Sequence, residues 1–166
     1  MPTPTLHFIC GPVGAGKTTY AIALARRARA VRFSVDEWIV GLFGKERPDP
    51  CPLEWTAERA ERCTALIWDV AEEIIAQDGN TVFDLGLPLQ EDRDVFRSRA
   101  MGTRASVKMH YLDVERATRL ARIQRRNQER TSPLALEMSP ETFDALDRAF
   151  QAPTDDELYG AMIVVE

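Results

Sequence analysis

Short runs of apolar residues recur along the chain, and each is bounded by polar or turn-forming positions. A run of this length is typical of a buried strand, whereas helices need longer segments with a different period. The runs predict five strands, at Leu6–Cys10, Val31–Ser34, Thr81–Leu85, Ser106–Leu112 and Ala161–Val165.

The intervals between these runs carry helical patterns. Cys63, Ile67, Val70 and Ile74 share one face of a helix that stops at Asp78-Gly79-Asn80, and Ser139 followed by Pro140 is a typical helix start. Strands that alternate with helices in this way predict a parallel sheet covered on both faces. The expected helices are Thr18–Arg29, Thr56–Ala76, Gln90–Met101, Val114–Arg130 and a short one that begins at Ser139.

The segment Phe43–Trp55 breaks this alternation, because it contains Pro48, Pro50 and Pro52. We expect it to be irregular, since proline fits neither a helix interior nor a central strand. Two interpretations stay open: a loop over one edge of a ligand site, or a plain surface connector.

Length, charge and cysteine content limit the classes of protein. A chain of 166 residues suits a single domain, and a net charge of −5 counts against a protein that coats nucleic acid or acidic membranes, although a local basic groove would be compatible with it. No apolar run is long enough to cross a membrane, and Met1–Thr5 lacks the pattern of a signal peptide, so we expect a soluble cytoplasmic protein. Cys10, Cys51 and Cys63 suit reduced thiols, with Cys10 in the core.

The most specific motif follows the first predicted strand and opens the first predicted helix. It is a complete GxxxxGK[ST] pattern, which indicates a phosphate-binding loop for a nucleoside triphosphate. Glycines permit the tight turn, Lys17 supplies a charge for the outer phosphates, and Thr18 supplies a hydroxyl for Mg²⁺. The loop consists of Gly11, Pro12, Val13, Gly14, Ala15, Gly16, Lys17 and Thr18.

Two carboxylates follow predicted strands, where ligands of parallel sheets gather. Asp36 comes just after the second strand and could accept or orient the proton of an attacking hydroxyl; the alternative is that it caps a helix at Glu37. Asp84 ends the third strand and could reach the hydration shell of a magnesium ion or the substrate; the alternative is a turn-forming aspartate before Gly86.

Arginines are concentrated in the helix predicted after the fourth strand. Arg119, Arg122, Arg126 and Arg130 are spaced three or four residues apart and therefore form one stripe. We expect at least one of them to contact phosphate and to stabilise charge on a migrating phosphoryl group, as part of a lid that closes over it.

The remaining aromatic and imidazole side chains have plainer interpretations. His7 and His110 lie within strands and are expected to be packed, and Trp68 is expected in a helix interface. Trp38 and Trp55 stand near Asp36 and the proline-rich segment, so they could either pack or line an acceptor pocket.

The whole pattern resembles the small P-loop kinases of the zeta-toxin, chloramphenicol-phosphotransferase and polynucleotide-kinase group, proteins with an AAA-type ATP-binding domain. The resemblance covers nearly the whole chain. The segments that carry it are Gly11–Thr19, FSVDEW around Asp36, TVFD ending at Asp84, HYLDVERATRLARIQRRNQER with Arg126-Asn127, and Phe150-Gln151-Ala152-Pro153 with Asp156-Glu157.

The resemblance implies a three-layer α/β/α P-loop NTPase fold, with a five-stranded parallel sheet of nucleoside-kinase type and a short arginine-rich lid at about 116–139. It also implies ATP with Mg²⁺ as donor, transfer of the γ-phosphoryl group to a hydroxyl, and Asp36 as general base. Lys17, Thr19 and the loop amides would hold phosphate, Thr18 would bind the metal, Arg122, Arg126 and Arg130 would be lid arginines, and Ala152–Asp156 would lie near the adenine.

The acceptor does not carry over from the resemblance. Relatives have a second basic or polar motif that fixes the acceptor, where this chain has Gln90-Glu91-Asp92 and a single Arg93. The acidic charge and Leu85-Gly86-Leu87-Pro88 after Asp84 count against a nucleic-acid acceptor. We expect a kinase for a small metabolite or antibiotic, with a polynucleotide or nucleotide-sugar kinase and an ATP-hydrolysing switch protein as alternatives. The sequence leaves the oligomeric state and the preference between ATP and GTP open.

Overall fold

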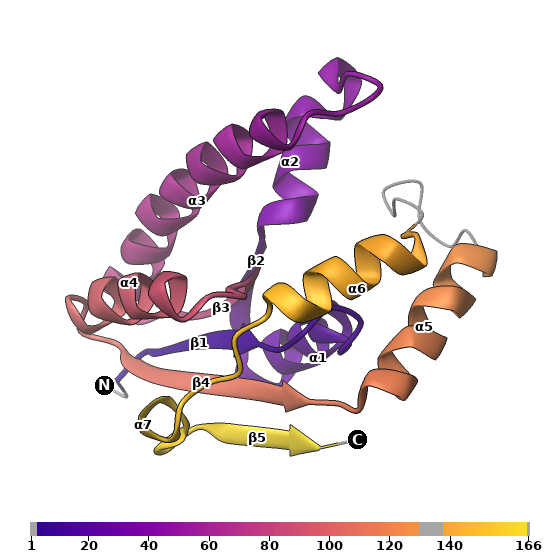
Figure 1. Cartoon of the computed structure of the whole chain (residues 1–166). Helices are drawn as coiled ribbons and strands as arrows, with labels where there is room; N and C mark the ends of the chain where they lie inside the picture. The colour runs from indigo at the N-terminus through magenta and orange to yellow at the C-terminus, as the bar shows by residue number, and fades with distance from the viewer. Residues whose placement is uncertain (1–2, 130–137, 166) are drawn as a thin grey trace.

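A five-stranded parallel sheet forms the centre of the molecule, in the strand order β2-β3-β1-β4-β5 (Figure 1). The computed structural model describes residues 3–129 and 138–165. Because the strands are all parallel, they end at the same edge of the sheet, which places the turns after β1, β2 and β3 side by side. The strands are β1 Thr5–Cys10, β2 Ala30–Ser34, β3 Asn80–Gly86, β4 Ser106–Asp113 and β5 Met162–Val165.

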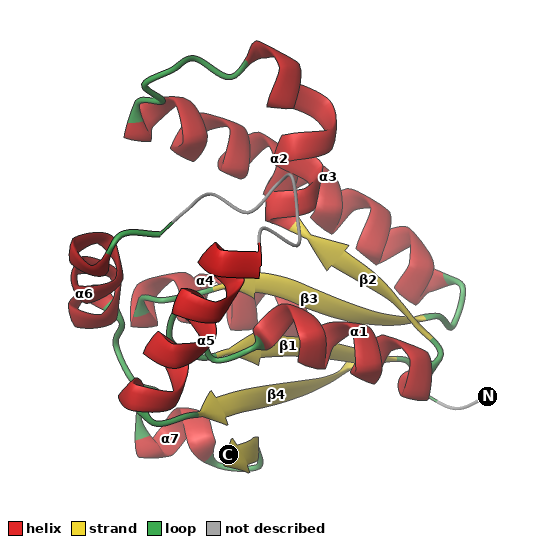
Figure 2. Cartoon of the chain, turned by 90° about the vertical axis from the view of Figure 1, so that its right-hand side faces the viewer, coloured by secondary structure: helices red, strands yellow, loops and turns green. Residues whose placement is uncertain are grey.

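Helices cover both faces of this sheet, as Figure 2 shows. On one face α1 packs over a core that includes Ile9, Leu24 and Leu112. On the other face α3 and α4 pack over a larger core rich in aromatic rings. The helices are α1 Lys17–Ala28, α2 Val35–Phe43, the 3₁₀ helix η1 Gly44–Glu46, α3 Leu53–Ala76, α4 Gln90–Met101, α5 Arg116–Glu129, α6 Pro140–Ala149 and α7 Asp155–Leu158.

The predicted strands and helices are all present among the described residues, with ends shifted by up to three residues. The three-layer α/β/α fold is therefore confirmed. Cys10, Cys63 and Trp68 are buried, as expected.

The prediction for Phe43–Trp55 is wrong at both ends. Phe43 closes α2, a 3₁₀ turn follows it, and Trp55 lies inside α3. Pro52 stands at the N-cap of α3 with φ −64°, where the missing N–H of proline costs nothing. Together α2 and α3 form a helical hairpin that projects from the sheet (Figure 1).

Two helix starts complete the comparison with the sequence. The cap of α2 is Ser34, whose hydroxyl accepts a 3.5 Å hydrogen bond from the Glu37 amide, so the alternative that Asp36 caps this helix is wrong. The short helix α7 was not expected, and it begins with a capping box formed by Thr154 and Glu157.

Arg93 is fully buried, which the sequence did not suggest. Its guanidinium makes a bidentate pair with Glu157 at 2.7 and 3.1 Å and also donates to the Leu87 and Pro88 carbonyls. A buried pair of this kind is stable only when both partners are present. The Arg93–Glu157 pair connects α4 to α7, in the segment after α6. Because Arg93 is buried in this pair, it is not a surface group that could select an acceptor.

A chain of three polar side chains crosses the interface between α1 and the sheet. The Tyr20 hydroxyl lies 2.9 Å from His110 Nδ1, and His110 Nε2 lies 2.9 Å from His7 Nδ1. Each of these two contacts needs one hydrogen atom, which neutral imidazoles can supply and accept. The pKa of each histidine is lowered from 6.5 to about 4, mainly by burial; the charges of Lys108 and Arg27 contribute for both, and His7 contributes for His110.

This histidine pair predicts a loss of stability in mild acid. Between pH 6.5 and 4 the unfolded chain binds protons that the folded protein does not, so the free energy of unfolding decreases as the pH falls through this window. The loss should reach roughly 3 kcal/mol per histidine, and the full stability should be present above pH 6.5. Urea unfolding of the wild type and of a His7→Gln/His110→Gln double variant measures it. Equal pH slopes for the two proteins would contradict the assignment.

Candidate active site

The phosphate-loop motif lies between β1 and α1, at the edge of the sheet where the strands end. Gly14 and Gly16 have φ values of 78° and 90°, which other residues rarely adopt. Gly16 is the N-cap of α1 and no side chain caps the helix there. The first amides of α1 are therefore available to an anion, at the positive end of the helix dipole.

Gly14 also has no room for a side chain. A Cβ atom at this position would lie 2.8 Å from the Arg119 carbonyl oxygen and 3.1 Å from Arg119 Cβ. The backbone of α5 thus packs directly on the loop. This contact explains why a glycine stands at a position that the motif itself leaves unspecified.

Lys17 is turned onto its own loop. Its ammonium donates hydrogen bonds of 2.8 and 2.9 Å to the carbonyls of Gly11 and Pro12. Desolvation lowers the pKa of Lys17, while the charges of Asp84 and Asp36 act in the opposite direction. The ammonium thus contacts the loop, and both candidate carboxylates are near enough to influence its pKa.

Asp36 lies in the first turn of α2, beside Lys17. Partial desolvation raises the pKa of its carboxyl above the usual 3.8, although Lys17 opposes the shift. The side chain is nevertheless exposed to solvent. A carboxylate that is accessible, has a raised pKa and stands near a cation is suited to accept a proton.

Asp84 is buried on β3, opposite Ser34 of β2. Desolvation raises the pKa of its carboxyl, and a hydrogen bond from the Thr18 hydroxyl is the largest opposing effect. Arg32 on β2 approaches Asp84 at 3.5 Å, and its Nη2 donates to both carboxylate oxygens of Glu37 at 2.7 Å. Sequence reasoning missed Arg32, because its contact with Asp84 depends on the pairing of β2 with β3.

The arginines of α5 have different environments. Arg122 donates a 3.1 Å hydrogen bond to the Ala15 carbonyl and so reaches the phosphate loop. Arg126 is partly buried, and its Nε has no hydrogen-bond partner among the described residues. Arg130 lies outside the described residues, and Thr19 is exposed in the first turn of α1.

Arg119 is a structural residue, contrary to the expectation of one phosphate-facing stripe. It is 6% exposed and donates to the Val114 carbonyl at 2.9 Å, the Val13 carbonyl at 3.1 Å and the Asp147 carboxylate at 2.7 Å. All three acceptors belong to different parts of the chain. Arg119 thereby joins the phosphate loop, the start of α5 and helix α6.

Substitution of Arg119 should therefore affect folding as well as the loop. We expect Arg119→Ala to lower the free energy of unfolding by about 3 kcal/mol, because the hydrogen bonds of a buried guanidinium to the Val114 and Val13 carbonyls are lost, while Asp147 keeps its 3.3 Å contact with Arg116. Arg125 is the matched control: it lies on the same helix, its side chain is 73% exposed, and Arg125→Ala should change stability by less than about 0.5 kcal/mol. Urea unfolding compares the two, and equal losses would refute this role.

The segment after α6 lies against the start of α4. The Gln151 amide donates to the Pro88 carbonyl at 2.9 Å, and the Gln151 side chain accepts a 2.8 Å hydrogen bond from the Gln90 amide. These bonds place Ala152–Asp156, the residues that the resemblance assigns to the adenine, beside the turn that follows β3.

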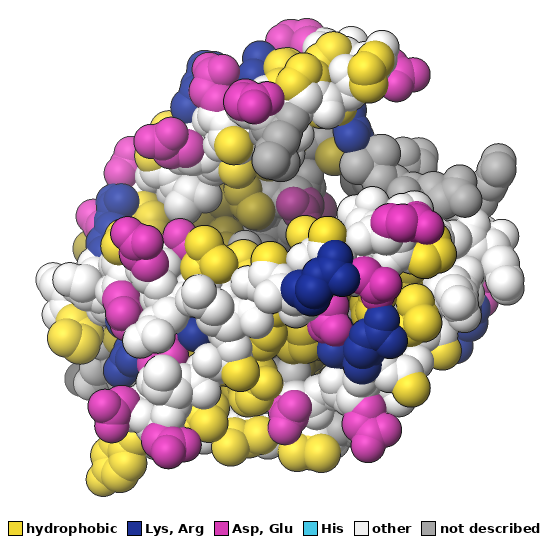
Figure 3. Space-filling view, viewed as in Figure 1, with side chains coloured by type: hydrophobic (Ala, Val, Ile, Leu, Met, Phe, Trp, Pro, Cys, Tyr) yellow, Lys and Arg dark blue, Asp and Glu magenta, His cyan; other side chains and the backbone are white. Residues whose placement is uncertain are grey.

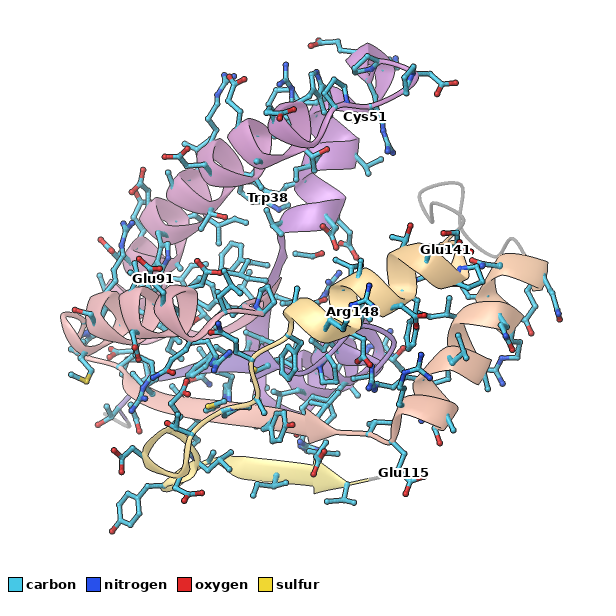
Figure 4. All side chains as sticks on the ribbon, viewed as in Figure 1. Trp38, Cys51, Glu91, Glu115, Glu141 and Arg148 are labelled. Atoms are coloured by element: carbon cyan, nitrogen blue, oxygen red, sulfur yellow. The ribbon has the colours of Figure 1, made fainter. Side chains whose placement is uncertain are left out.

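The surface is hollowed between the α2–α3 hairpin and α6, as Figure 3 shows. Figure 4 places Trp38 on the side of α2 that faces α3, and its ring packs against Phe33 at a centroid distance of 6.2 Å. Trp38 is thus a packing residue. Trp55 contacts Arg59, whose guanidinium lies 4.0 Å from the centroid of the Trp55 ring.

The fold and the phosphate loop define an α/β protein of the P-loop class. The chain belongs to the AAA domain family, whose sequence model matches residues 6–153. No curated protein matches it. Within the described residues, no helix is both long and apolar enough to cross a membrane.

Solved structures share the fold at low sequence identity. A candidate kinase from Chloroflexus aurantiacus has a TM-score of 0.75 and 19% identity, over 99% of this chain and 89% of its own. Kti12 of Chaetomium thermophilum, in complex with ADP-AlF3, has a TM-score of 0.69 and 13% identity over 96% and 88%. A gluconokinase from Sinorhizobium meliloti has a TM-score of 0.60 and 15% identity, over 99% of this chain and 84% of its own. The resemblance to small P-loop kinases is thereby confirmed.

Proposed function

We propose that the protein is a kinase that transfers the γ-phosphoryl group of ATP to a hydroxyl of a small molecule. The observation that carries the proposal is the placement of Lys17, Asp36 and Asp84 at the edge where the strands end: Asp84 pairs with Ser34, two residues before Asp36, and β3 lies beside β1, which leads into the phosphate loop. A protein that only binds and hydrolyses the nucleotide needs the lysine and a carboxylate near the metal ion, a role that suits Asp84. A phosphotransferase also needs a carboxylate that faces the acceptor, and Asp36 is suited to that role.

The donor half of the site consists of the loop and the helix behind it. The loop amides and the start of α1 would bind the phosphates, and Lys17 would exchange its contacts with the Gly11 and Pro12 carbonyls for phosphate oxygens. Arg122 already contacts the loop at Ala15, so it can turn to a phosphate oxygen over a short path. Charge that spreads over the migrating group would be stabilised by both cations.

The acceptor half is centred on Asp36. Its carboxylate would accept a hydrogen bond from the acceptor hydroxyl and take the proton as the new oxygen–phosphorus bond forms. Because desolvation raises the pKa of Asp36, its carboxylate is a better base than an ordinary aspartate.

The residues present suit a magnesium ion. Thr18 and Asp84 offer oxygen atoms that already lie within hydrogen-bonding contact of each other, and magnesium prefers oxygen ligands. Thr18 would bind the ion directly, and Asp84 would hold it directly or through its water. When bound, the ion supplies charge neutralisation at the phosphates.

A screen of hydroxyl acceptors with γ-labelled ATP tests the proposal. Sugars, amino alcohols, hydroxylated antibiotics, nucleotide sugars and 5′-hydroxyl oligonucleotides are each incubated with the protein and with the Asp36→Asn variant. A kinase yields a labelled acceptor that depends on Asp36. Free phosphate as the sole product, at the same rate with and without acceptors, would identify the ATP-hydrolysing switch and overturn the proposal.

A further inference from the structure

Arginine and aromatic side chains meet near the outer end of the α2–α3 hairpin. The guanidinium of Arg59 lies 4.0 Å from the centroid of the Trp55 ring and 5.5 Å from that of Phe43. Its Nη1 donates a 3.1 Å hydrogen bond to the Trp55 carbonyl. Stacking between rings and a backbone bond hold the planar group in one orientation. We call Arg59, Trp55 and Phe43 the arginine-aromatic cluster.

The hydrogen bonding of Arg59 is incomplete. The Arg59 side chain is 17% exposed. Its Nε atom is shielded from solvent and has no hydrogen-bond partner among the described residues. The nearest carboxylate is Glu58, which is 3.5 Å from Nη1, is 63% exposed and is shared with Arg62. Buried Arg93 and Arg119, in contrast, each have a close carboxylate and carbonyl partners. A guanidinium with unused donors can bind a further anionic group.

The cluster lies on the same side of α2 as Asp36. Phe43 comes seven residues after Asp36, which is two helical turns and places both on one face, about 10 Å apart along the axis. On α3, Arg59 continues the line of buried residues Cys63 and Ile67, each four positions further on. The Arg59 guanidinium lies 5.5 Å from the centroid of the Phe43 ring, so it is associated with a residue about two turns of α2 beyond Asp36.

A second cation reinforces the positive charge at this place. Cys51 lies near the start of α3 (Figure 4). The pKa of its thiol is lowered, first by a hydrogen bond with Thr56 and then by Arg47 and Arg59, while desolvation opposes the shift. Arg47 and Arg59 therefore both lie near enough to Cys51 to influence the pKa of its thiol.

We propose that Arg59 binds an anionic group of the acceptor, a phosphate or a carboxylate, while Asp36 receives the hydroxyl at the other end. The acceptor would then be a hydroxylated small molecule that carries its negative charge about two helical turns from the reacting oxygen. This inference rests on the proposed function, since it names the substrate class of that site. It favours sugar phosphates, hydroxy acids and nucleotide-like acceptors over neutral antibiotics.

Tryptophan fluorescence tests the binding step without turnover. The protein is first saturated with Mg·ADP to occupy the phosphate loop, and inorganic phosphate or acetate is then added at constant ionic strength. Because the guanidinium stacks on Trp55, a saturable change in emission is expected, and Trp55→Phe should remove the signal. Arg59→Gln should abolish the saturation. The control is Arg62→Gln, because Arg62 also lies over Phe43, at 5.7 Å, but is 61% exposed.

The responses to phosphate and acetate identify which anion the site prefers. Absence of a saturable change with both anions, or an unaltered response in Arg59→Gln, would overturn the inference. Failure of Mg·ADP itself to bind would instead overturn the proposed function, so the two failures are distinguishable.

Turnover provides an independent test, in which the KM of a neutral acceptor is compared with that of its anionic counterpart. Suitable pairs are a sugar and its phosphate, or a polyol and its hydroxy acid. We expect Arg59→Gln to raise the KM of the charged member at least about tenfold and to leave the KM of the neutral member within about twofold. Arg59→Lys should restore part of the loss, since it keeps the charge without the planar group. Equal effects on both members would contradict a role in anion binding.

Discussion

Replacement of Asp36 by asparagine is expected to lower the rate of phosphoryl transfer by about a hundredfold to ten-thousandfold, the usual contribution of a general base. The amide keeps the shape of the side chain but cannot take the proton of the acceptor hydroxyl. Binding of Mg·ADP should change little, because Asp36 lies on α2 and the loop amides lie between β1 and α1.

A kinetic comparison of kcat, KM and nucleotide affinity checks this result. Asp69→Asn is the control, because Asp69 is a 69% exposed carboxylate on α3 that pairs with Arg99. The acid limb of the wild-type pH profile should lie above pH 3.8, since desolvation raises the pKa of Asp36, and it should vanish in Asp36→Asn. Full phosphotransfer in this variant would remove the base assignment.

Replacement of Lys17 by alanine should abolish ATP turnover. The ammonium contacts the Gly11 and Pro12 carbonyls, and its charge acts on both active-site carboxylates, so its removal takes positive charge away from Asp36 and Asp84; Arg32, 3.5 Å from Asp84, compensates that carboxylate only in part. The negative charges of carboxylates and phosphates repel one another strongly in a site partly shielded from water.

Labelled ATP and calorimetry measure the two consequences, loss of turnover and weaker nucleotide binding. Lys108→Ala serves as the control, because Lys108 is an exposed lysine on β4. The fold should survive both changes, as circular dichroism would verify. Undiminished turnover in Lys17→Ala would refute the entire scheme, including the acceptor proposals.

The sequence predicts those parts of the fold and site that depend on local pattern. The phosphate loop is a contiguous motif whose residue types follow from the geometry of a turn and a helix start, so its position between β1 and α1 could be stated in advance. Asp36 and Asp84 were identified because parallel strands end at one edge, a property of the topology rather than of the neighbouring residues.

Other features depend on partners far along the chain. Arg119 and Arg122 are equivalent by helical spacing, but Asp147 lies 28 residues beyond Arg119 and makes it a structural residue. His7 and His110 are 103 residues apart, and only the pairing of β1 with β4 brings them into contact. Arg59 sits among charged residues of a surface helix, and nothing in its local pattern indicates that its Nε is shielded.

The buried pair of Arg93 and Glu157 bears on where the folding unit ends. The family match stops at residue 153, which suggests a natural point for truncation. A chain cut there would lose Glu157 and the strand β5 and would leave the guanidinium of Arg93 uncompensated in the interior. The minimal autonomous unit is therefore longer than the conserved family core, and any shortened version for crystallisation or fusion should retain the residues through β5.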